Sequence, residues 1–226
     1  MICLSLTSDS TLVLTTSSGY YVDVRIQLPP NFDGDLRFLN GDPDTLELDW
    51  AFAGTSLSTT SGSSRSCTWT HWIDTIYPYG HQDSGTMWEL KDGTTLEIGS
   101  MENPATGKVE DYQEIWEDLR PTIDREQVGQ AKFHARMLYK EGSKGMIINI
   151  GGWLQGIRID GEGEGRNVTV ERWCFVDHNE KCGDWKLMFK VGDGDMPIEF
   201  MMKGITDQVK VVWRDEWDEW KVVEHS

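Results

Sequence analysis

The sequence predicts an all-β protein built from two small antiparallel β-barrels in tandem, joined by one short helix. Roughly ten short segments alternate apolar and polar residues with the period of a strand, and turn residues separate them at regular intervals. One segment has convincing helical spacing instead. The parts 1–125 and 126–226 also look alike, since each has tryptophan-bearing strands followed by acidic hairpins. We therefore expect one barrel half in each part, with the helix in the first.

Two strands are expected near the start of the chain, at residues 11–15 and 21–28. A Ser-Ser-Gly turn joins them, and the pair Pro29 and Pro30 ends the second. In the second strand the apolar side chains share one face, and Arg25 lies on the other. An arginine in mid-strand is normally solvated. If this face closes a barrel, however, Arg25 becomes an inward cation that can contact an oxyanion.

Two aromatic strands follow, at residues 46–54 and 67–74. On the first, one face carries Leu46, Leu48, Trp50 and Phe52. On the second, one face carries Trp69, His71 and Ile73, and the opposite face carries Trp72 and Asp74. Both faces of the second strand join an indole to an ionisable group, so one of them could line a cavity. Residues 55–66 are rich in Ser, Thr and Gly, a composition that predicts an exposed hairpin loop.

The only predicted helix comes next, after a hairpin at residues 86–99 whose tip is Asp92-Gly93. It covers residues 110–120, and Pro121 ends it. Its apolar side chains recur at helical spacing, at Tyr112, Ile115, Trp116 and Leu119. We expect this helix to plug or cover a sheet.

The second half is predicted to consist of further strands, at residues 131–139, 145–159, 167–176, 185–190 and 198–202. The paired glycines 151 and 152 predict a bend or bulge in a curved sheet. At the end of the chain three tryptophans lie at helical spacing, but the flanking Lys-Val-Val runs favour a hairpin that turns at residues 214–218.

The charge and composition exclude several classes of function. A net charge of −17 repels phosphate backbones and anionic lipids, so neither nucleic acid nor a membrane surface is an expected partner. The chain has no cationic leader and no apolar run of 18 residues, and we expect a soluble, cytoplasmic protein. The 4 cysteines are then expected to stay reduced.

Motifs for common cofactors and catalytic sites were tested and rejected. Cys174, His178 and Cys182 could form a metal triad by residue type, but they flank a turn sequence without a regularly spaced fourth ligand. The Gly-Glu-Gly-Glu-Gly run at 161–165 has the wrong spacing for a phosphate loop and carries two carboxylates. No Gly-x-Ser-x-Gly elbow is present. We therefore expect neither a metal nor a cofactor.

Several motifs together resemble the fungal Hri-one family, named after a yeast protein that interacts with a casein-kinase homologue. The matching runs keep their order over nearly the whole chain: Leu-Asp-Trp-Ala-Phe-Ala-Gly-Thr at 48–55, Trp-Thr-His-Trp-Ile-Asp at 69–74, Gly-Ser-Met-Glu-Asn-Pro-Ala-Thr-Gly at 99–107, Tyr-Gln-Glu-Ile-Trp at 112–116, Ile-Asn-Ile-Gly-Gly-Trp-Leu-Gln-Gly at 148–156 and Val-Glu-Arg-Trp at 170–173. The resemblance implies a lipocalin-like fold of two β-barrel halves. Similar proteins include hetero-Diels–Alderases of tropolonic sesquiterpenoid biosynthesis.

Two functions from different classes follow. The first is a cofactor-independent pericyclase of fungal secondary metabolism. It joins a polyketide-derived diene, formed by loss of water as an o-quinone methide, to a terpene alkene, so its partners are apolar small molecules. The second is a lipocalin-like protein that binds a small molecule or a kinase without catalysis. An apolar pocket of several hundred cubic ångströms favours catalysis, whereas sealed cores favour the second reading.

Candidate site residues follow from strand alternation. We expect an acid–base or oxyanion-stabilising role for His71, Asp74 and Arg25. Side chains expected to contact substrate are Trp50, Phe52, Trp69, Trp153, Gln155 and Trp173. The alternative for each tryptophan is core packing, and for His71 and Asp74 a structural hydrogen-bonded pair. Exposed barrel edges and the tryptophans near the end of the chain also make a homodimer conceivable.

Overall fold

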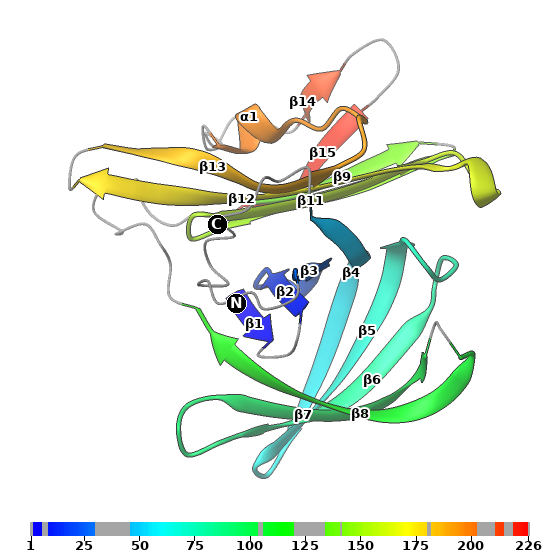
Figure 1. Cartoon of the computed structure of the whole chain (residues 1–226), viewed down its shortest axis with the longest axis vertical. Helices are drawn as coiled ribbons and strands as arrows, with labels where there is room; N and C mark the ends of the chain where they lie inside the picture. The colour runs from blue at the N-terminus through cyan, green and yellow to red at the C-terminus, as the bar shows by residue number, and fades with distance from the viewer. Residues whose placement is uncertain are drawn as a thin grey trace.

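The structure is a computed structural model of the chain that describes residues 2–5, 9–29, 46–103, 106–119, 134–140, 142–179, 182–202, 211–214 and 219–225. Within these ranges the chain forms fifteen β-strands, one α-helix and one short 3-10 helix. The prediction of an all-β protein is confirmed. Figure 1 shows two bodies, a barrel formed by the first half of the chain and a sheet formed by the second.

The first half is a closed barrel in which each strand pairs antiparallel with the next and β1 pairs with β8. Its strands are β1 (Ile2–Ser5), β2 (Asp9–Thr15), β3 (Tyr20–Gln27), β4 (Glu47–Ser61), β5 (Ser64–Asp74), β6 (Gln82–Glu89), β7 (Thr95–Asn103) and β8 (Lys108–Asp118). In a closed barrel, side chains alternate along each strand between the interior and the outer surface. The barrel prediction for this half is confirmed.

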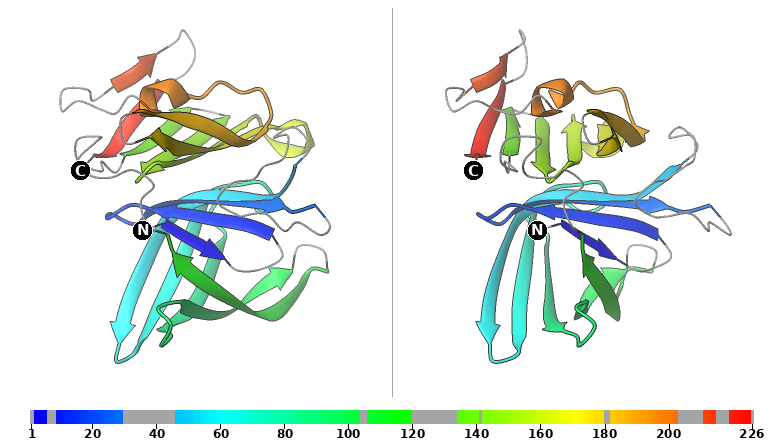
Figure 2. Two further views of the ribbon diagram at one scale, coloured as in Figure 1. Left: turned by 60° about the vertical axis from the view of Figure 1, so that its left-hand side comes forward. Right: turned by 90° about the vertical axis from the view of Figure 1, so that its left-hand side faces the viewer.

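The second half is a seven-stranded sheet rather than a second closed barrel among the described residues. In spatial order its strands are β13 (Cys182–Val191), β12 (Asn167–Asn179), β11 (Trp153–Asp160), β10 (Ser143–Ile150), β9 (His134–Lys140), β15 (Glu219–His225) and β14 (Val211–Arg214). Figure 2 shows this sheet as a separate layer along one side of the barrel. The predicted tail hairpin is confirmed as β14 and β15, and its turn at 215–218 lies outside the described residues.

A continuous apolar layer joins the sheet to the barrel. The outward face of β3, with Val22, Val24 and Ile26, packs against Met146, Ile148, Ile157 and Phe189 of the sheet. All of these side chains are fully buried. Burial of an aliphatic side chain contributes roughly 1.5–3 kcal/mol, so this layer is a main source of stability. It also explains why β3 is apolar on one face and charged on the other.

Polar side chains cross the same layer and bind backbone groups of the barrel. Gln155 on β11 donates to the carbonyl oxygens of Leu12 and Val22, at 2.9 and 3.2 Å. Arg172 on β12 donates to Gln155 Oε1, to Ser10 and to the carbonyl oxygen of Val24. The two halves are therefore held together by directed hydrogen bonds as well as by apolar packing.

Bulges in two barrel strands reverse the faces expected from simple alternation. Register shifts occur on β4 at Asp49 and on β5 at Trp72. An extra residue in one strand turns every later side chain to the other face. As a result Trp50 and Phe52 point inward, whereas Leu48 packs against the layer between barrel and sheet. The expectation that Leu46 and Leu48 share a face with the aromatic residues was wrong.

The predicted helix at 110–120 is strand β8, and this expectation was also wrong. Its side chains Tyr112 and Trp116 fit helical spacing, but together with Glu114 they also fit the period of a strand. Pairing of β8 with β7 on one side and β1 on the other closes the barrel and satisfies the backbone. Ladder hydrogen bonds from two neighbours therefore override the local helical pattern.

Three other local predictions differ from the structure. The segment expected as a strand at 198–202 is the helix α1 (Ile198–Met202), whose Ile198 and Met201 pack on the outer face of the sheet. Gly151 and Gly152 have positive φ and form the two-residue turn between β10 and β11, rather than a bend within one strand. The expected loop at 55–66 continues as β4 and β5, which meet at a tight turn.

Candidate active site in the barrel

The barrel contains a partly open cavity of about 70 Å³, lined by a set of apolar side chains, here called the apolar wall, and a set of polar and charged side chains, here called the charged wall. The apolar wall includes Phe52, Trp69, Met87, Met101 and Trp116. The charged wall consists of Asp23, Arg25, Asp83, Glu97, Tyr112 and Glu114. A single water needs about 10–15 Å³ and drug-sized ligands about 300–1,000 Å³. The space therefore holds several waters or part of a small ring.

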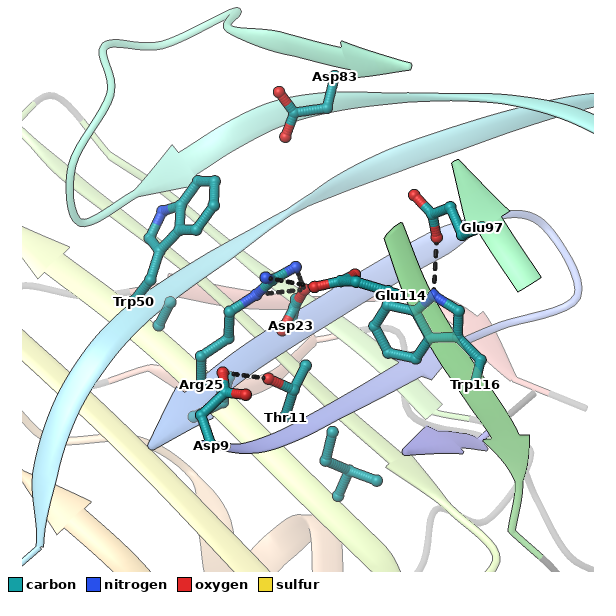
Figure 3. A network of polar contacts seen from close by, with 12 residues as sticks. Asp9, Thr11, Asp23, Arg25, Trp50, Asp83, Glu97, Glu114 and Trp116 are labelled. Atoms are coloured by element: carbon teal, nitrogen blue, oxygen red, sulfur yellow. Dashed lines mark hydrogen bonds and ion pairs between the residues drawn. The ribbon is translucent and has the colours of Figure 1, made fainter. Parts of the chain in front are cut away.

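Arg25 forms the centre of the charged wall. Its guanidinium donates to Asp23 Oδ2 at 3.2 Å and to Glu114 Oε1 at 3.0 Å, and it lies 5.2 Å from the ring centre of Trp50. Figure 3 shows these groups converging from β3, β4 and β8. Burial lowers the pKa of Arg25, but the two carboxylates more than offset this and raise it above its usual value. Arg25 is therefore a permanent cation inside the barrel.

Asp23 is buried beside that cation but keeps one oxygen unused. Burial raises its pKa to about 6, although the charge of Arg25 lowers it in part. Its Oδ1 and the hydroxyl of Tyr21, the neighbouring inward residue on β3, are buried and make no hydrogen bond. Buried polar atoms without partners are rare and costly. Two residues that line the cavity therefore each carry a buried polar atom without a hydrogen-bond partner.

Glu97 forms a second acid–base group in the same wall. It accepts hydrogen bonds from Tyr112 Oη at 2.7 Å and from Trp116 Nε1 at 2.8 Å. The pKa of Glu97 is raised to about 7, because the effect of burial exceeds the opposing effect of the hydrogen bond from Tyr112. The carboxyl group can therefore hold or release a proton near neutral pH.

Two glycines make room for this pair. Gly85 on β6 and Gly99 on β7 face each other in the ladder. A Cβ on Gly85 would lie 2.7 Å from Glu97 Oε1, and a Cβ on Gly99 would lie 2.5 Å from the Tyr112 ring. Any larger residue at either position would displace the side chains of the site.

His71 and Asp74 form a buried pair behind the aromatic wall. His71 Nδ1 lies 2.5 Å from Asp74 Oδ2, and its ring stacks on Phe52 at 4.3 Å. Asp74 Oδ1 accepts hydrogen bonds from Trp50 Nε1 and from two backbone amides. Burial lowers the pKa of His71, but its contacts with Asp74 and Asp83 outweigh burial and raise it. The bulge at Trp72 brings His71 and Asp74 to one side of the strand, although their spacing predicted opposite faces.

A second hollow of about 360 Å³ lies at the end of the barrel where the β4–β5 turn and β6 meet β8. Met87 and Trp116 line both hollows, so they separate the inner cavity from this outer one. Arg65 also lines the outer hollow, and its guanidinium donates to the Met87 sulfur at 3.3 Å. Methionine is unbranched and flexible, so a shift of Met87 can join the two spaces.

Comparison with known proteins identifies the family. A family model described as Protein HRI1 matches residues 5–224. The chain belongs to the HRI1 family. The structure is similar to the crystal structure of an uncharacterised protein, YLR301w, from Saccharomyces cerevisiae, with a TM-score of 0.72 and 20% identity over 100% of this chain and 98% of that one. This likeness shows a shared fold. A search of curated proteins found no match.

In this HRI1-family chain the predicted site residues fall into three groups. Arg25, Phe52 and Trp69 line the inner cavity. Trp50, His71 and Asp74 are buried one layer behind it. Trp153, Gln155 and Trp173 lie in the second half, away from the cavity: the first two in the layer between barrel and sheet, and Trp173 against the cluster that includes α1. Their contact with a substrate stays a prediction, and these three residues are not among those that line the barrel cavity.

The sequence reasoning missed most of the charged wall. Asp23 shares a face with Arg25, so the alternation that singled out Arg25 could also have identified it. Tyr112, Glu114 and Trp116 alternate in the same way, but they were assigned to a helix. Nothing local distinguishes Glu97 or Asp83 from a solvated hairpin carboxylate, because only barrel closure brings them inside.

The described part of the chain also bears on the metal, cysteine and membrane expectations. No group of three or more His, Cys, Asp or Glu side chains there could hold a metal ion. The side chains of His178 and Cys182, from the rejected triad, lie outside the described residues. Cys67 and Cys174 are buried, and neither takes part in a disulfide bond. In those same ranges, no helix has the length and apolar character needed to cross a bilayer.

The raised pKa of Glu97 predicts a specific pH dependence of stability. Because the folded state binds this proton more tightly than the unfolded state, the contribution to stability is complete below about pH 4 and is lost as the pH rises through about 7. The free energy of unfolding should fall between pH 4 and pH 8 in the wild type. In the Glu97→Gln variant, which has no carboxyl group to titrate there, we expect this fall to be smaller by on the order of 2–3 kcal/mol. Urea unfolding at both pH values measures this. Equal losses in the two proteins would contradict the burial of a protonatable Glu97.

Proposed function

We propose that the barrel is the active site of a cofactor-independent hetero-Diels–Alderase of fungal secondary metabolism. In this proposal it converts a hydroxymethyl-bearing polyketide ring into a quinone methide and joins that diene to a terpene alkene. The observation that carries the proposal is one cavity inside the barrel that is lined both by acid–base carboxyl groups and by aromatic rings. Such a cavity can supply proton transfer and orientation without a coenzyme.

The first step is loss of water, and two carboxyl groups of the cavity suit its two proton transfers. Asp23, with a pKa of about 6, is mostly ionised at neutral pH and accepts the proton of the ring hydroxyl. Glu97, with a pKa of about 7, is partly protonated and donates to the leaving hydroxyl through the Tyr112 hydroxyl. The C–O bond breaks, water leaves, and one proton has moved from Glu97 to Asp23. Arg25 stabilises the negative charge that develops on the ring oxygen.

The second step needs only orientation and the exclusion of water. The quinone methide adds water when it is exposed, and the rings of Phe52, Trp69 and Trp116 shield it. The inner cavity accommodates part of the reactive ring, and the outer hollow gives room for the alkene partner once Met87 moves. Holding both partners in contact can lower the activation free energy of the cycloaddition by several kcal/mol.

The size of the inner cavity favours a second candidate, a binding protein without catalysis. At about 70 Å³ the cavity is smaller than the range of about 300–1,000 Å³ usual for ligand sites. A lipocalin-like barrel with this interior would hold one small polar molecule, or act through its acidic surface as an adaptor for a kinase.

Incubation of the purified protein with humulene and a quinone-methide precursor tests the first candidate. We expect one stereoisomer to form faster than in the protein-free reaction, and the Arg25→Gln variant to lose most of that excess. Trp153→Phe is the matched control, because Trp153 is buried far from the cavity. A rate and isomer ratio equal to those of the protein-free reaction would leave the binding protein as the better candidate.

A further inference from the structure

A row of carboxylate and imidazole groups leads from the cavity to the surface of the barrel. Asp83 on β6 lines the cavity, and each of its oxygens faces an imidazole nitrogen. Oδ1 lies 3.1 Å from His81 Nε2, and Oδ2 lies 3.2 Å from His71 Nε2. In Figure 3 the Asp83 carboxylate points into the same interior as Arg25. Asp83 thus touches both the cavity and two proton-carrying side chains.

His71 cannot be the outer end of this row. Its side chain is 0% exposed, and its other nitrogen is held by Asp74. Asp74 is in turn held by Trp50 and by backbone amides, so it is fixed as a hydrogen-bond acceptor. The contact of His71 Nε2 with Asp83 has an ion-pair distance but not the angles of a good hydrogen bond. His71 therefore acts as a fixed partner that orients Asp83.

His81 is the outer end, because its side chain is 22% exposed. Its ring stacks on Tyr77 at 4.0 Å and lies edge-on to His71 at 5.2 Å, which fixes its orientation toward Asp83. Imidazole exchanges protons in both directions near neutral pH. A proton on Asp83 therefore has a direct acceptor that is in contact with solvent.

We propose that Asp83 and His81 carry protons between the barrel cavity and solvent, and that the Asp74–His71 pair positions Asp83 for this transfer. The proposal rests on the proposed function, since each loss of water leaves a proton on Asp23 and removes one from Glu97. A proton from the cavity binds the Asp83 carboxylate and makes it the neutral acid. With the acid hydrogen on Oδ1, Asp83 passes the proton to His81 Nε2 in the tautomer whose hydrogen is on Nδ1, and His81 then releases its Nδ1 proton to water. Only O–H and N–H bonds change, and no co-reactant is needed.

The surroundings of Asp83 support its role as a carrier rather than a permanent acid. Burial raises its pKa, but the close contact with the His71 ring outweighs burial and lowers it. It therefore returns to the carboxylate after each transfer. The titratable groups that act on it or feel its charge are His71, His81, Tyr21, Tyr77 and Tyr112. The tyrosines do not ionise near neutral pH, so the two histidines dominate.

Proton exchange measured by NMR tests the path without relying on activity. In the ¹⁵N-labelled full chain, we expect the Nε2 proton of His71 to exchange with water about tenfold more slowly in His81→Gln than in the wild type. Asp83→Asn should slow this exchange as well. The control is Gln82→Ala, which alters the exposed neighbour of both residues. Unchanged exchange in His81→Gln and Asp83→Asn would overturn the proposal.

A second measurement applies if the cyclisation is observed. We expect His81→Ala to lower the rate and to shift its pH profile, and added imidazole to restore the rate, because free imidazole can replace the missing proton acceptor. A purely structural His81 would show neither effect. If the wild type catalyses the cyclisation but imidazole does not restore the rate of His81→Ala, the result counts against the proton path and leaves the proposed function standing. Absence of cyclisation in the wild type counts against the proposed function, and the exchange experiment then decides the path.

Discussion

Replacing Arg172 by alanine is expected to lower the free energy of unfolding by about 3–5 kcal/mol. Arg172 is 2% exposed and donates to four acceptors on three strands from both halves of the molecule. Burial lowers the pKa of this arginine to about 9, which reflects how little water reaches it. Removal leaves a large void and leaves carbonyl oxygens such as that of Val24 with fewer donors.

Urea unfolding at pH 7 measures this loss. Lys186→Ala is the matched control, since Lys186 is an exposed cation on the neighbouring strand β13, and its loss should stay within about 0.5 kcal/mol. Arg172→Met separates the two causes, because methionine refills much of the volume but cannot donate hydrogen bonds. A loss below about 1 kcal/mol for alanine would show that the apolar layer alone holds the halves together.

The Glu97→Gln variant is expected to reduce the rate of the proposed dehydration by about 10²–10³-fold at neutral pH. Glutamine can keep the hydrogen bonds to Tyr112 and Trp116, but it cannot donate the proton that the leaving hydroxyl needs. The wild-type rate should fall as the pH rises through about 7, where Glu97 loses its proton, and this limb should be absent from the variant.

Steady-state rates from pH 5 to pH 9 check this expectation. Glu117→Gln serves as the control, because Glu117 is exposed on β8 beside Trp116 and points away from the cavity. A pH profile of Glu97→Gln that still falls through about 7 would mean that another group supplies the proton. Unfolding curves of both variants establish that a lost rate is not a lost fold.

Much of the barrel wall could be predicted because strand alternation is a local property. The apolar face of β3, and the position of Arg25 on the opposite face, follow from residues 21–28 alone. The aromatic strands β4 and β5 were also placed correctly. Which of their side chains share a face was not predicted correctly, because Asp49 and Trp72 lie in bulges. The residue types at these two positions do not indicate an extra residue in the ladder.

Barrel closure could not be predicted from any one segment. β1 and β8 are separated by about half of the chain, and the backbone of β8 chooses a strand only because β7 and β1 offer hydrogen bonds on both sides. The same closure brings Asp23, Asp83, Glu97 and Glu114 into one cavity. Taken alone, each of these carboxylates has the signature of a solvated residue in a hairpin.

The sequence by itself determined the all-β class, the family and the two faces of the strand that carries Arg25, because side-chain alternation and motif order need no partner strand. Only the tertiary structure decided that the second half is a sheet, that Trp153, Gln155 and Trp173 lie away from the cavity, and that His71 meets Asp74 and Asp83. These outcomes depend on strand pairing and register. Both are set by hydrogen bonds between residues far apart in the chain, and a shift of one residue changes which side chains meet.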